Sequence, residues 1–218
     1  TSMRIIDGHK GCCEYSTRFH GAEGHGSRPE LGVNAVEYAT RYVARLMELR
    51  AALAAAPPEG SRFEPPHTTL SVGALTGGVA HNVIPGLAQV DWEMRPVAWD
   101  DALRVKTELQ AFCDATLLPE MRAVSAGAGI ETDVVGEVVG LEPRAENAAR
   151  DLVASLLGSN GADLVAFGTE AGLFQEIGLD AIVCGPGSIA QAHKPDEYVE
   201  VSELERALTL LHGLAGKV

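Results

Sequence analysis

The sequence of 218 residues has few cysteines and no long apolar run. Its cysteines are Cys12, Cys13, Cys113 and Cys184. Two are adjacent and no C-x-x-C pair occurs, which argues against a disulfide framework and against a structural zinc finger. We therefore interpret them as reduced thiols of a cytoplasmic protein. Because no apolar run of about 18 residues is present, no transmembrane helix is predicted, and no signal peptide is visible.

Cations are also scarce. Only 17 Lys and Arg residues stand against 30 Asp and Glu, which gives a net charge of −13. Binding to nucleic acid or to an anionic membrane needs clustered cations, so the composition argues against both partners. The sequence also lacks the H-E-x-x-H, G-x-S-x-G and phosphate-loop motifs. The hydrophobic share of 46% is that of an ordinary globular protein.

The first two thirds of the chain alternate between strand and helix patterns. Period-two alternation of apolar residues predicts four strands, at residues 11–20, 68–76, 86–95 and 130–139. Helical spacing predicts one helix that begins after the N-cap Asn34 and another that begins at Asp100 and ends at Pro119. The order strand, helix, strand, strand, helix, strand indicates a ferredoxin-like antiparallel sheet with both helices on one face.

The remainder of the chain has an α/β pattern. Helices are predicted at residues 146–157 and 168–177, short buried strands at 164–167 and 181–184, and a last helix at a capping box of Ser202 and Glu205. The inner face of that last helix is predicted to carry Leu204, Leu208 and Leu211. Two short strands cannot cover their own faces and edges. We therefore expect either another chain to complete this part or the sequence to be a piece of a longer protein.

Several positions outside any strong motif could carry chemistry. His193 lies in a loop after an apolar run, the region where open α/β sheets bind their ligands. It is therefore placed to be a metal ligand, and the alternative is an ordinary surface histidine. His25 lies in a Gly-rich loop and is either exposed or functional. Arg95 at a strand end could clamp a carboxylate, and Asn82 could simply form a turn. The peptide Gly185-Pro186-Gly187 could form an anion nest or a plain turn.

Eight short stretches in a fixed order resemble a known family. They are residues 8–11, 24–29, 32–35, 77–85, 91–96, 168–171 with 185–188, and 192–198. Together they resemble the dizinc metallopeptidase and amidohydrolase superfamily. The resemblance implies a lid and dimerisation domain at residues 8–141, followed at 142–218 by the C-terminal part of a catalytic domain. Residues 1–7 would then be a remnant of the segment before the lid, because members carry their other metal ligands and their general base upstream.

The resemblance also implies roles for single residues of the lid. His25 matches a lid histidine that reaches the active site of the partner subunit and donates a hydrogen bond to the oxyanion. Asn82 and Arg95 match lid residues that hold the carbonyl and the carboxylate of the substrate. His9 lies in one of the matching stretches, but it has no comparable context and is treated as a surface or packing residue.

In the C-terminal part, His193 matches the last zinc ligand, and Gly185 and Gly187 match a loop that approaches the substrate carboxylate. Thr169 and Glu170 match a pocket-lining position, and Glu170 would suit an amino group of an ornithine-type substrate. The resemblance thus implies an N-acyl amino-acid hydrolase that uses zinc or cobalt, and the remaining ligands of the metal would lie outside this chain.

The expected substrate is N-acetylornithine, and the expected assembly is a homodimer through the lid. The alternatives are hydrolysis of N-succinyl-diaminopimelate or of N-acyl amino acids in general, and, in another class, a non-catalytic dimerisation module. The chain by itself is expected to be inactive.

Overall fold

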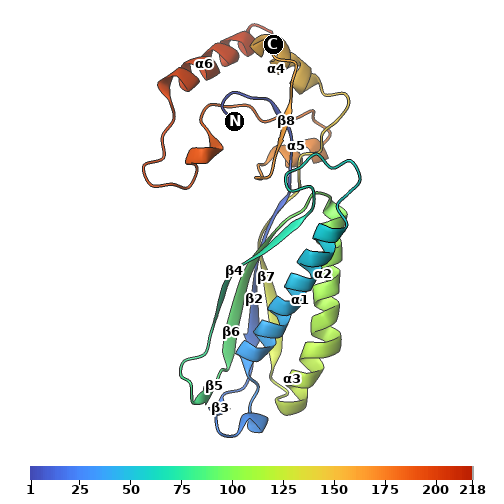
Figure 1. Ribbon diagram of the computed structural model, residues 1–218, viewed down its shortest axis with the longest axis vertical. Helices are drawn as coiled ribbons and strands as arrows, with labels where there is room; N and C mark the ends of the chain where they lie inside the picture. The colour runs from blue at the N-terminus through green and yellow to red at the C-terminus, as the bar shows by residue number, and fades with distance from the viewer. Residues whose placement is uncertain (218) are drawn as a thin grey trace. The chain divides into compact units, whose positions relative to one another are not determined.

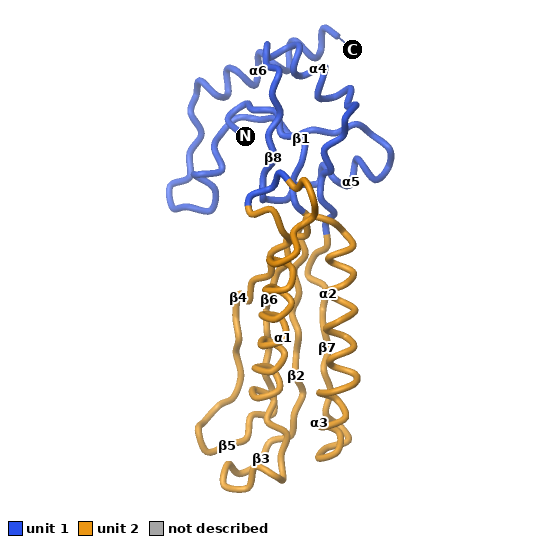
Figure 2. Tube along the Cα trace, turned by 45° about the vertical axis from the view of Figure 1, so that its right-hand side comes forward, with its two compact units in different colours: residues 1–10, 62–64, 138–218 blue, residues 11–61, 65–137 orange. Residues whose placement is uncertain are grey.

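The computed structural model describes residues 1–217 and divides the chain into two compact units. The first unit contains residues 1–10, 62–64 and 138–218, and the second contains residues 11–61 and 65–137 (Figure 2). The boundaries expected from the sequence lie within four residues of the points at which the second unit begins and ends. Residues 62–64 interrupt the second unit and belong to the first, which the sequence pattern does not predict. No helix among the described residues is long and apolar enough to cross a membrane.

The second unit is built on a four-stranded sheet. Its strands are β2 (Cys12–His20), β4 (Thr69–Gly77), β6 (Leu87–Arg95) and β7 (Gly129–Val138). Their spatial order is β4-β6-β2-β7, and β6 pairs antiparallel with both β2 and β4. This is the ferredoxin-like arrangement, so the fold class predicted from the sequence is confirmed.

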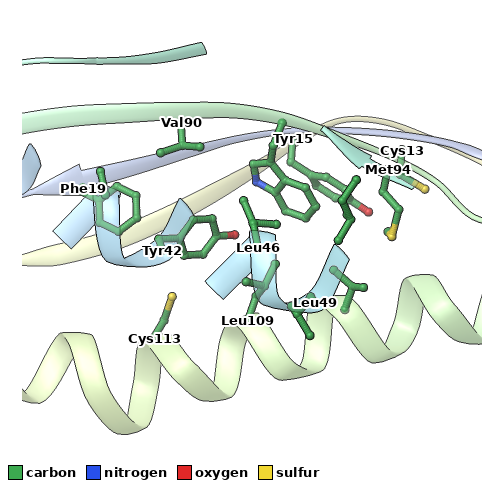
Figure 3. Packing of buried hydrophobic residues seen from close by; sticks show 14 of the residues in the cluster. Cys13, Tyr15, Phe19, Tyr42, Leu46, Leu49, Val90, Met94, Leu109 and Cys113 are labelled. Atoms are coloured by element: carbon green, nitrogen blue, oxygen red, sulfur yellow. The ribbon is translucent and has the colours of Figure 1, made fainter. Parts of the chain in front are cut away.

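Two helices cover one face of this sheet (Figure 1). They are α1 (Ala35–Ala55) and α2 (Trp99–Phe112). As predicted, Asn34 caps α1, because its side chain accepts hydrogen bonds from the backbone N–H groups of Val36 and Glu37. The alternation of β2 and β6 places one side of each strand in the core, where aromatic and aliphatic side chains of the sheet meet those of α1 and α2 (Figure 3).

The end of α2 differs from the prediction. Pro119 does not terminate the helix, because the chain continues through a π-helical turn (Cys113–Leu117) into α3 (Leu118–Val124). Pro119 lies in the first turn of α3, where a missing backbone N–H costs little. The N-cap prediction is also wrong: Ala98 takes that position, and Asp100 lies within the first turn of α2.

The loop predicted between β2 and α1 contains two short elements. The strand β3 (Gly24–His25) pairs antiparallel with β5 (Val83–Ile84), and a 3-10 turn, η1, covers Pro29–Leu31. Both short strands lie at the end of the sheet where β6 begins (Figure 1).

The first unit has less regular structure. The strand β1 (Ile6–His9) pairs in parallel with β8 (Asp163–Val165). Its helices are α4 (Ala148–Leu157), α5 (Ala171–Glu176), the 3-10 turn η3 (Ile189–Gln191) and α6 (Val201–Ala215). Residues 181–184, predicted to be a buried parallel strand, form only one isolated antiparallel bridge, between Val183 and Ile6.

The predicted inner face of α6 is exposed. Leu204, Leu208 and Leu211 face outward, whereas Ala207, Leu210 and Leu214 belong to the apolar cluster of the first unit. The helix is rich in leucine over most of its circumference, so its pattern could not distinguish the two faces. Ser202 lies inside α6, and Glu200 occupies the N-cap without a side-chain hydrogen bond, so the predicted capping box does not form.

The core of the second unit generates a stability prediction. Leu46 is 2% exposed in the main apolar cluster, whereas its neighbour Met47 is 50% exposed on the same helix. We expect Leu46→Ala to lower the free energy of unfolding by about 2–5 kcal/mol, because it leaves a cavity. Met47→Ala is the matched control and should change it by less than about 0.5 kcal/mol. Urea unfolding measures both values, and equal effects would contradict this packing.

Candidate functional site

The structure brings His25 and Asn82 together. His25 is paired with Val83 in the β3–β5 ladder, and the backbone N–H of Gly26 donates to the carbonyl of Asn82 at 2.8 Å. A Cβ at Gly26 would stand 3.0 Å from that carbonyl oxygen, so the loop approaches closely because this residue is glycine. Both predicted residues are exposed at one end of the sheet. Asn82 therefore does more than form a turn, since its backbone holds the loop that carries His25.

The surroundings of the His25 ring select one tautomer. The backbone N–H of Ser27 donates to Nδ1 of His25 at 3.2 Å, and the Ser27 hydroxyl lies 2.7 Å from the same nitrogen. A nitrogen that accepts a backbone N–H carries no proton of its own. The neutral imidazole therefore has its proton on Nε2. This nitrogen can donate a hydrogen bond to an oxygen atom that becomes negatively charged.

Arg95 lies at the opposite end of the same sheet. Its Nε and Nη2 both donate to one carboxylate oxygen of Glu93, at 3.1 and 2.6 Å, and Glu14 lies 4.0 Å from Nη2. These two carboxylates hold the guanidinium in place. Because both hydrogen bonds use the Nε and Nη2 side of the fork, Nη1 is the nitrogen with which Arg95 could bind a further carboxylate.

The length of β6 separates Arg95 from the pair of His25 and Asn82. The strand runs from Leu87, beside the β3–β5 ladder, to Arg95, and at 3.3 Å per residue its eight steps span about 26 Å. No small amino-acid derivative is that long. Within one chain, therefore, Arg95 and His25 cannot hold the same substrate.

In the first unit, Gly185 and Gly187 line an open cavity of about 570 Å³. The other lining residues are Thr1, Phe167, Val183, Cys184, Pro186, Ser188, Ile189, Ala192, Glu197, Tyr198 and Val199. The backbone N–H of Gly185 donates to the hydroxyl of Thr1 at 3.0 Å, so it is engaged and does not contribute to an open anion nest. Gly187 has a φ of 81°, a conformation that favours glycine.

His193 and Glu170 do not line this cavity. His193 directly follows the lining residue Ala192, is exposed, and donates its backbone N–H to the carboxylate of Glu197 at 3.1 Å. Glu170 is the exposed N-cap residue of α5. Within residues 1–217, no group of three or more His, Cys, Asp or Glu side chains is placed to hold a metal ion. The described residues therefore do not form a metal centre by themselves.

One buried histidine was not identified as a site residue from the sequence. His9 is 1% exposed, and its two ring nitrogens lie 2.8 Å from the carbonyl of Lys10 and 2.9 Å from the hydroxyl of Thr169. Burial lowers the pKa of His9, against smaller opposing effects of the Lys10 carbonyl and the Glu170 charge. In the sequence, the only feature that singles out His9 is its place in the stretch at residues 8–11, which resembles the family.

The geometry at His25 generates a spectroscopic prediction. In protein labelled with ¹⁵N-histidine, we expect the neutral imidazole of His25 to be protonated on Nε2 and bare on Nδ1. Ser27→Ala keeps the backbone N–H and should keep this tautomer. Nitrogen chemical shifts and two-bond couplings measure it, and a protonated Nδ1 would show that the loop is arranged differently.

The chain is similar in sequence to proteins of known name. The peptidase dimerisation domain family (M20_dimer) matches residues 7–121. The acetylornithine deacetylase of Myxococcus xanthus is 35% identical, over 97% of this chain and 54% of that protein. The enzyme of the same name from Klebsiella pneumoniae is 32% identical, over 92% and 50% respectively. The chain thus spans about half the length of the curated relatives it matches.

Solved structures confirm the fold. Aminopeptidase PepT from Bacillus cereus superposes with a TM-score of 0.69 at 18% identity, over 97% of this chain and 52% of that one. A tripeptidase from Staphylococcus aureus superposes with a TM-score of 0.68 at 19% identity, over 96% and 52%. At such identities the likeness concerns the fold alone. The family match, by contrast, covers more than half of the sequence, and the chain therefore belongs to the peptidase dimerisation domain family.

Proposed function

We propose that this chain is part of a homodimeric amidohydrolase that removes the acyl group from an N-acyl amino acid, with N-acetylornithine as its substrate. The names of the relatives support this reaction class. The observation that carries the proposal is the placement of His25 with Asn82 at one end of the lid sheet and of Arg95 at the other. This placement suits an active site that is assembled from two chains.

The reaction is hydrolysis of an amide, in which water adds to the acyl carbon and the carbonyl oxygen becomes an oxyanion. The Nε2–H of His25 is suited to donate to that oxygen, and one such hydrogen bond stabilises a transition state by about 3–4 kcal/mol. The side-chain amide of Asn82, which directly precedes the adjacent strand β5, is suited to hold the carbonyl group. Arg95 is suited to bind the carboxylate of the substrate through Nη1.

The proposal includes a metal ion, for which this chain supplies one expected ligand. The family resemblance implies zinc or cobalt with His193 as one ligand, and a catalytic site needs about three protein ligands. The described residues do not complete such a set. The roles of His25, Asn82 and Arg95 do not depend on which metal is bound.

The edge of the lid sheet at β4 is suited to pair with a second copy of this chain. The strand has nine residues, Thr69–Gly77, and none of them is charged or proline. Leu75 on this edge is 43% exposed, and Met47 of α1 lies beside the strand. An edge with a bulge at Gly73 but no charged side chain is open to pairing with another strand.

The opposite edge, β7, is protected by charges. Its acidic residues form ion pairs with neighbouring elements: Asp133 with Arg18 at 2.5 Å, and Glu137 with Lys106 at 2.8 Å. Charged side chains along an edge strand disfavour pairing with a second chain. The contrast between the edges favours a two-fold dimer through β4 and the exposed side of α1.

Complementation between two impaired variants, assayed at a substrate concentration well below the wild-type KM, tests the composite site. We expect His25→Ala to lower kcat by roughly a hundredfold or more, because an oxyanion donor acts as charge develops. Arg95→Ala should raise KM, because the carboxylate is bound in both the ground state and the transition state. In a heterodimer of the two variants, one active site receives intact Arg95 from one chain and intact His25 from the other.

Mixing the two variants of the complete protein should therefore restore about one quarter of the wild-type activity, since half of the dimers are mixed and each has one intact site. The matched control is a mixture of His25→Ala with Asn82→Ala, which lie at the same end of the sheet and should not complement. Activity in this control, or none in the first mixture, would refute the proposal. A panel with N-acetylornithine, N-succinyl-diaminopimelate and N-acetylmethionine identifies the substrate.

The oligomeric state tests the proposed edge. Leu75→Lys places a charge on β4 and should convert the dimer to a monomer, or weaken it by at least tenfold, because pairing would bury the new charge. Val135→Lys is the matched control, since Val135 is 65% exposed on the other edge, β7, and this change should leave the dimer intact. Sedimentation equilibrium measures both. Loss of the dimer only in Val135→Lys would assign the interface to β7.

A further inference from the structure

His9 lies where three segments of the first unit meet. It ends β1, the strand that pairs with β8 (Figure 2), and its register partner in β8 is Val165. Its backbone exchanges two hydrogen bonds with Leu141, each 3.0 Å long. The third segment is the turn of Thr169 and Glu170, which leads into α5 and reaches the imidazole through the Thr169 hydroxyl. The side chain is thus enclosed by elements that are far apart in the sequence.

The hydrogen bonds around the ring form a directed chain. A backbone carbonyl can only accept, so Nδ1 of His9 donates to the carbonyl of Lys10. The bare Nε2 therefore accepts from the hydroxyl of Thr169. That hydroxyl in turn accepts from the backbone N–H of Ala171 at 3.1 Å, in the first turn of α5. Each polar atom has one partner that fits its role, so the turn has one preferred arrangement.

The packing of α5 supports the same arrangement. A Cβ at Gly172 would stand 2.4 Å from the carbonyl oxygen of Val139 and 2.6 Å from that of Gly140. The start of α5 is thus pressed against the backbone of the segment that pairs with His9. Glu170, between Thr169 and this contact, is exposed, so its carboxylate faces solvent while its backbone is fixed.

We propose that His9 is a positioning residue: through Thr169 it fixes the turn that presents the Glu170 carboxylate to the free amino group of a diamino-acid substrate. The inference rests on the proposed function and adds to it the residues that recognise the amino group of the substrate side chain. Phe167, two residues before Thr169, lines the cavity that contains Gly185 and Gly187, so the turn lies next to that cavity. Glu170 does not itself line this cavity, and its carboxylate is placed only through the backbone of the turn. A carboxylate at this position favours a cationic side chain over an apolar one of equal length.

The test is the preference of the complete protein for N-acetylornithine over N-acetylnorleucine, which has a methyl group in place of the amino group. Glu170→Gln should lower the ratio of the two kcat/KM values by roughly tenfold or more, because it removes a charged hydrogen bond. His9→Phe keeps a ring but no acceptor, and should lower the ratio by a similar factor through KM. His9→Gln offers a carbonyl to Thr169 and should restore part of the preference.

A second pair of variants keeps His9 and changes only its partner. Thr169→Val removes the hydroxyl and should lower the preference, whereas Thr169→Ser keeps the hydroxyl and should retain it. In the ¹⁵N-histidine spectrum, His9 should be protonated on Nδ1, opposite to the tautomer expected at His25. The Nε2 signal of His9 should shift in Thr169→Val and stay in place in Thr169→Ser.

The outcomes separate this inference from the proposed function. If Glu170→Gln lowers the preference but His9→Phe and Thr169→Val do not, the positioning role is wrong. If Glu170→Gln has no effect, the assignment of the amine site is wrong. If the wild-type protein hydrolyses neither compound, the proposed function is refuted. The spectrum tests the hydrogen bond between His9 and Thr169 without any substrate, and a proton on Nε2 of His9 would overturn the inference in every case.

Discussion

The ladder of antiparallel hydrogen bonds that holds β6 between β2 and β4 fixes the distance on which the functional argument depends. A strand paired on both sides cannot shorten. The stacked rings of Tyr15 and Trp92, with centroids 4.3 Å apart, add packing on the helix-covered face. The full length of β6, about 26 Å, therefore separates the end of the sheet that carries His25 from the end that carries Arg95. A dimer with composite sites is the simplest arrangement in which both could act on a small substrate.

The two histidines that matter in this account differ in which nitrogen carries the proton. At His25, a backbone N–H occupies Nδ1 and leaves Nε2–H to donate outward. At His9, a backbone carbonyl accepts a hydrogen bond from Nδ1–H, and the bare Nε2 accepts one from the hydroxyl of Thr169. A backbone group thus decides the tautomer of each histidine. The tautomer of His25 suits an exposed hydrogen-bond donor, and the tautomer of His9 suits a buried structural acceptor.

Sequence patterns predicted the second unit better than the first. Alternation in β2 and β6 identified the buried face of the sheet because one side of each strand is polar. In α6 nearly every turn offers a leucine, so hydrophobicity alone could not select Leu210 over Leu208. Pro119 failed as a helix stop because a π-helical turn accommodates it. His9 was missed because its partner Thr169 lies 160 residues away in the sequence, a contact that no local pattern encodes.

In the proposed dimer, the two ends of one lid sheet serve different active sites. The most direct measurement is a crystal structure of the complete protein with a phosphinate analogue of N-acetylornithine, which mimics the tetrahedral intermediate. We expect one bound analogue to contact Arg95 of one subunit through its carboxylate and His25 of the other subunit through its phosphinate oxygen. An analogue that contacts Arg95 and His25 of the same chain, or neither residue, would contradict it.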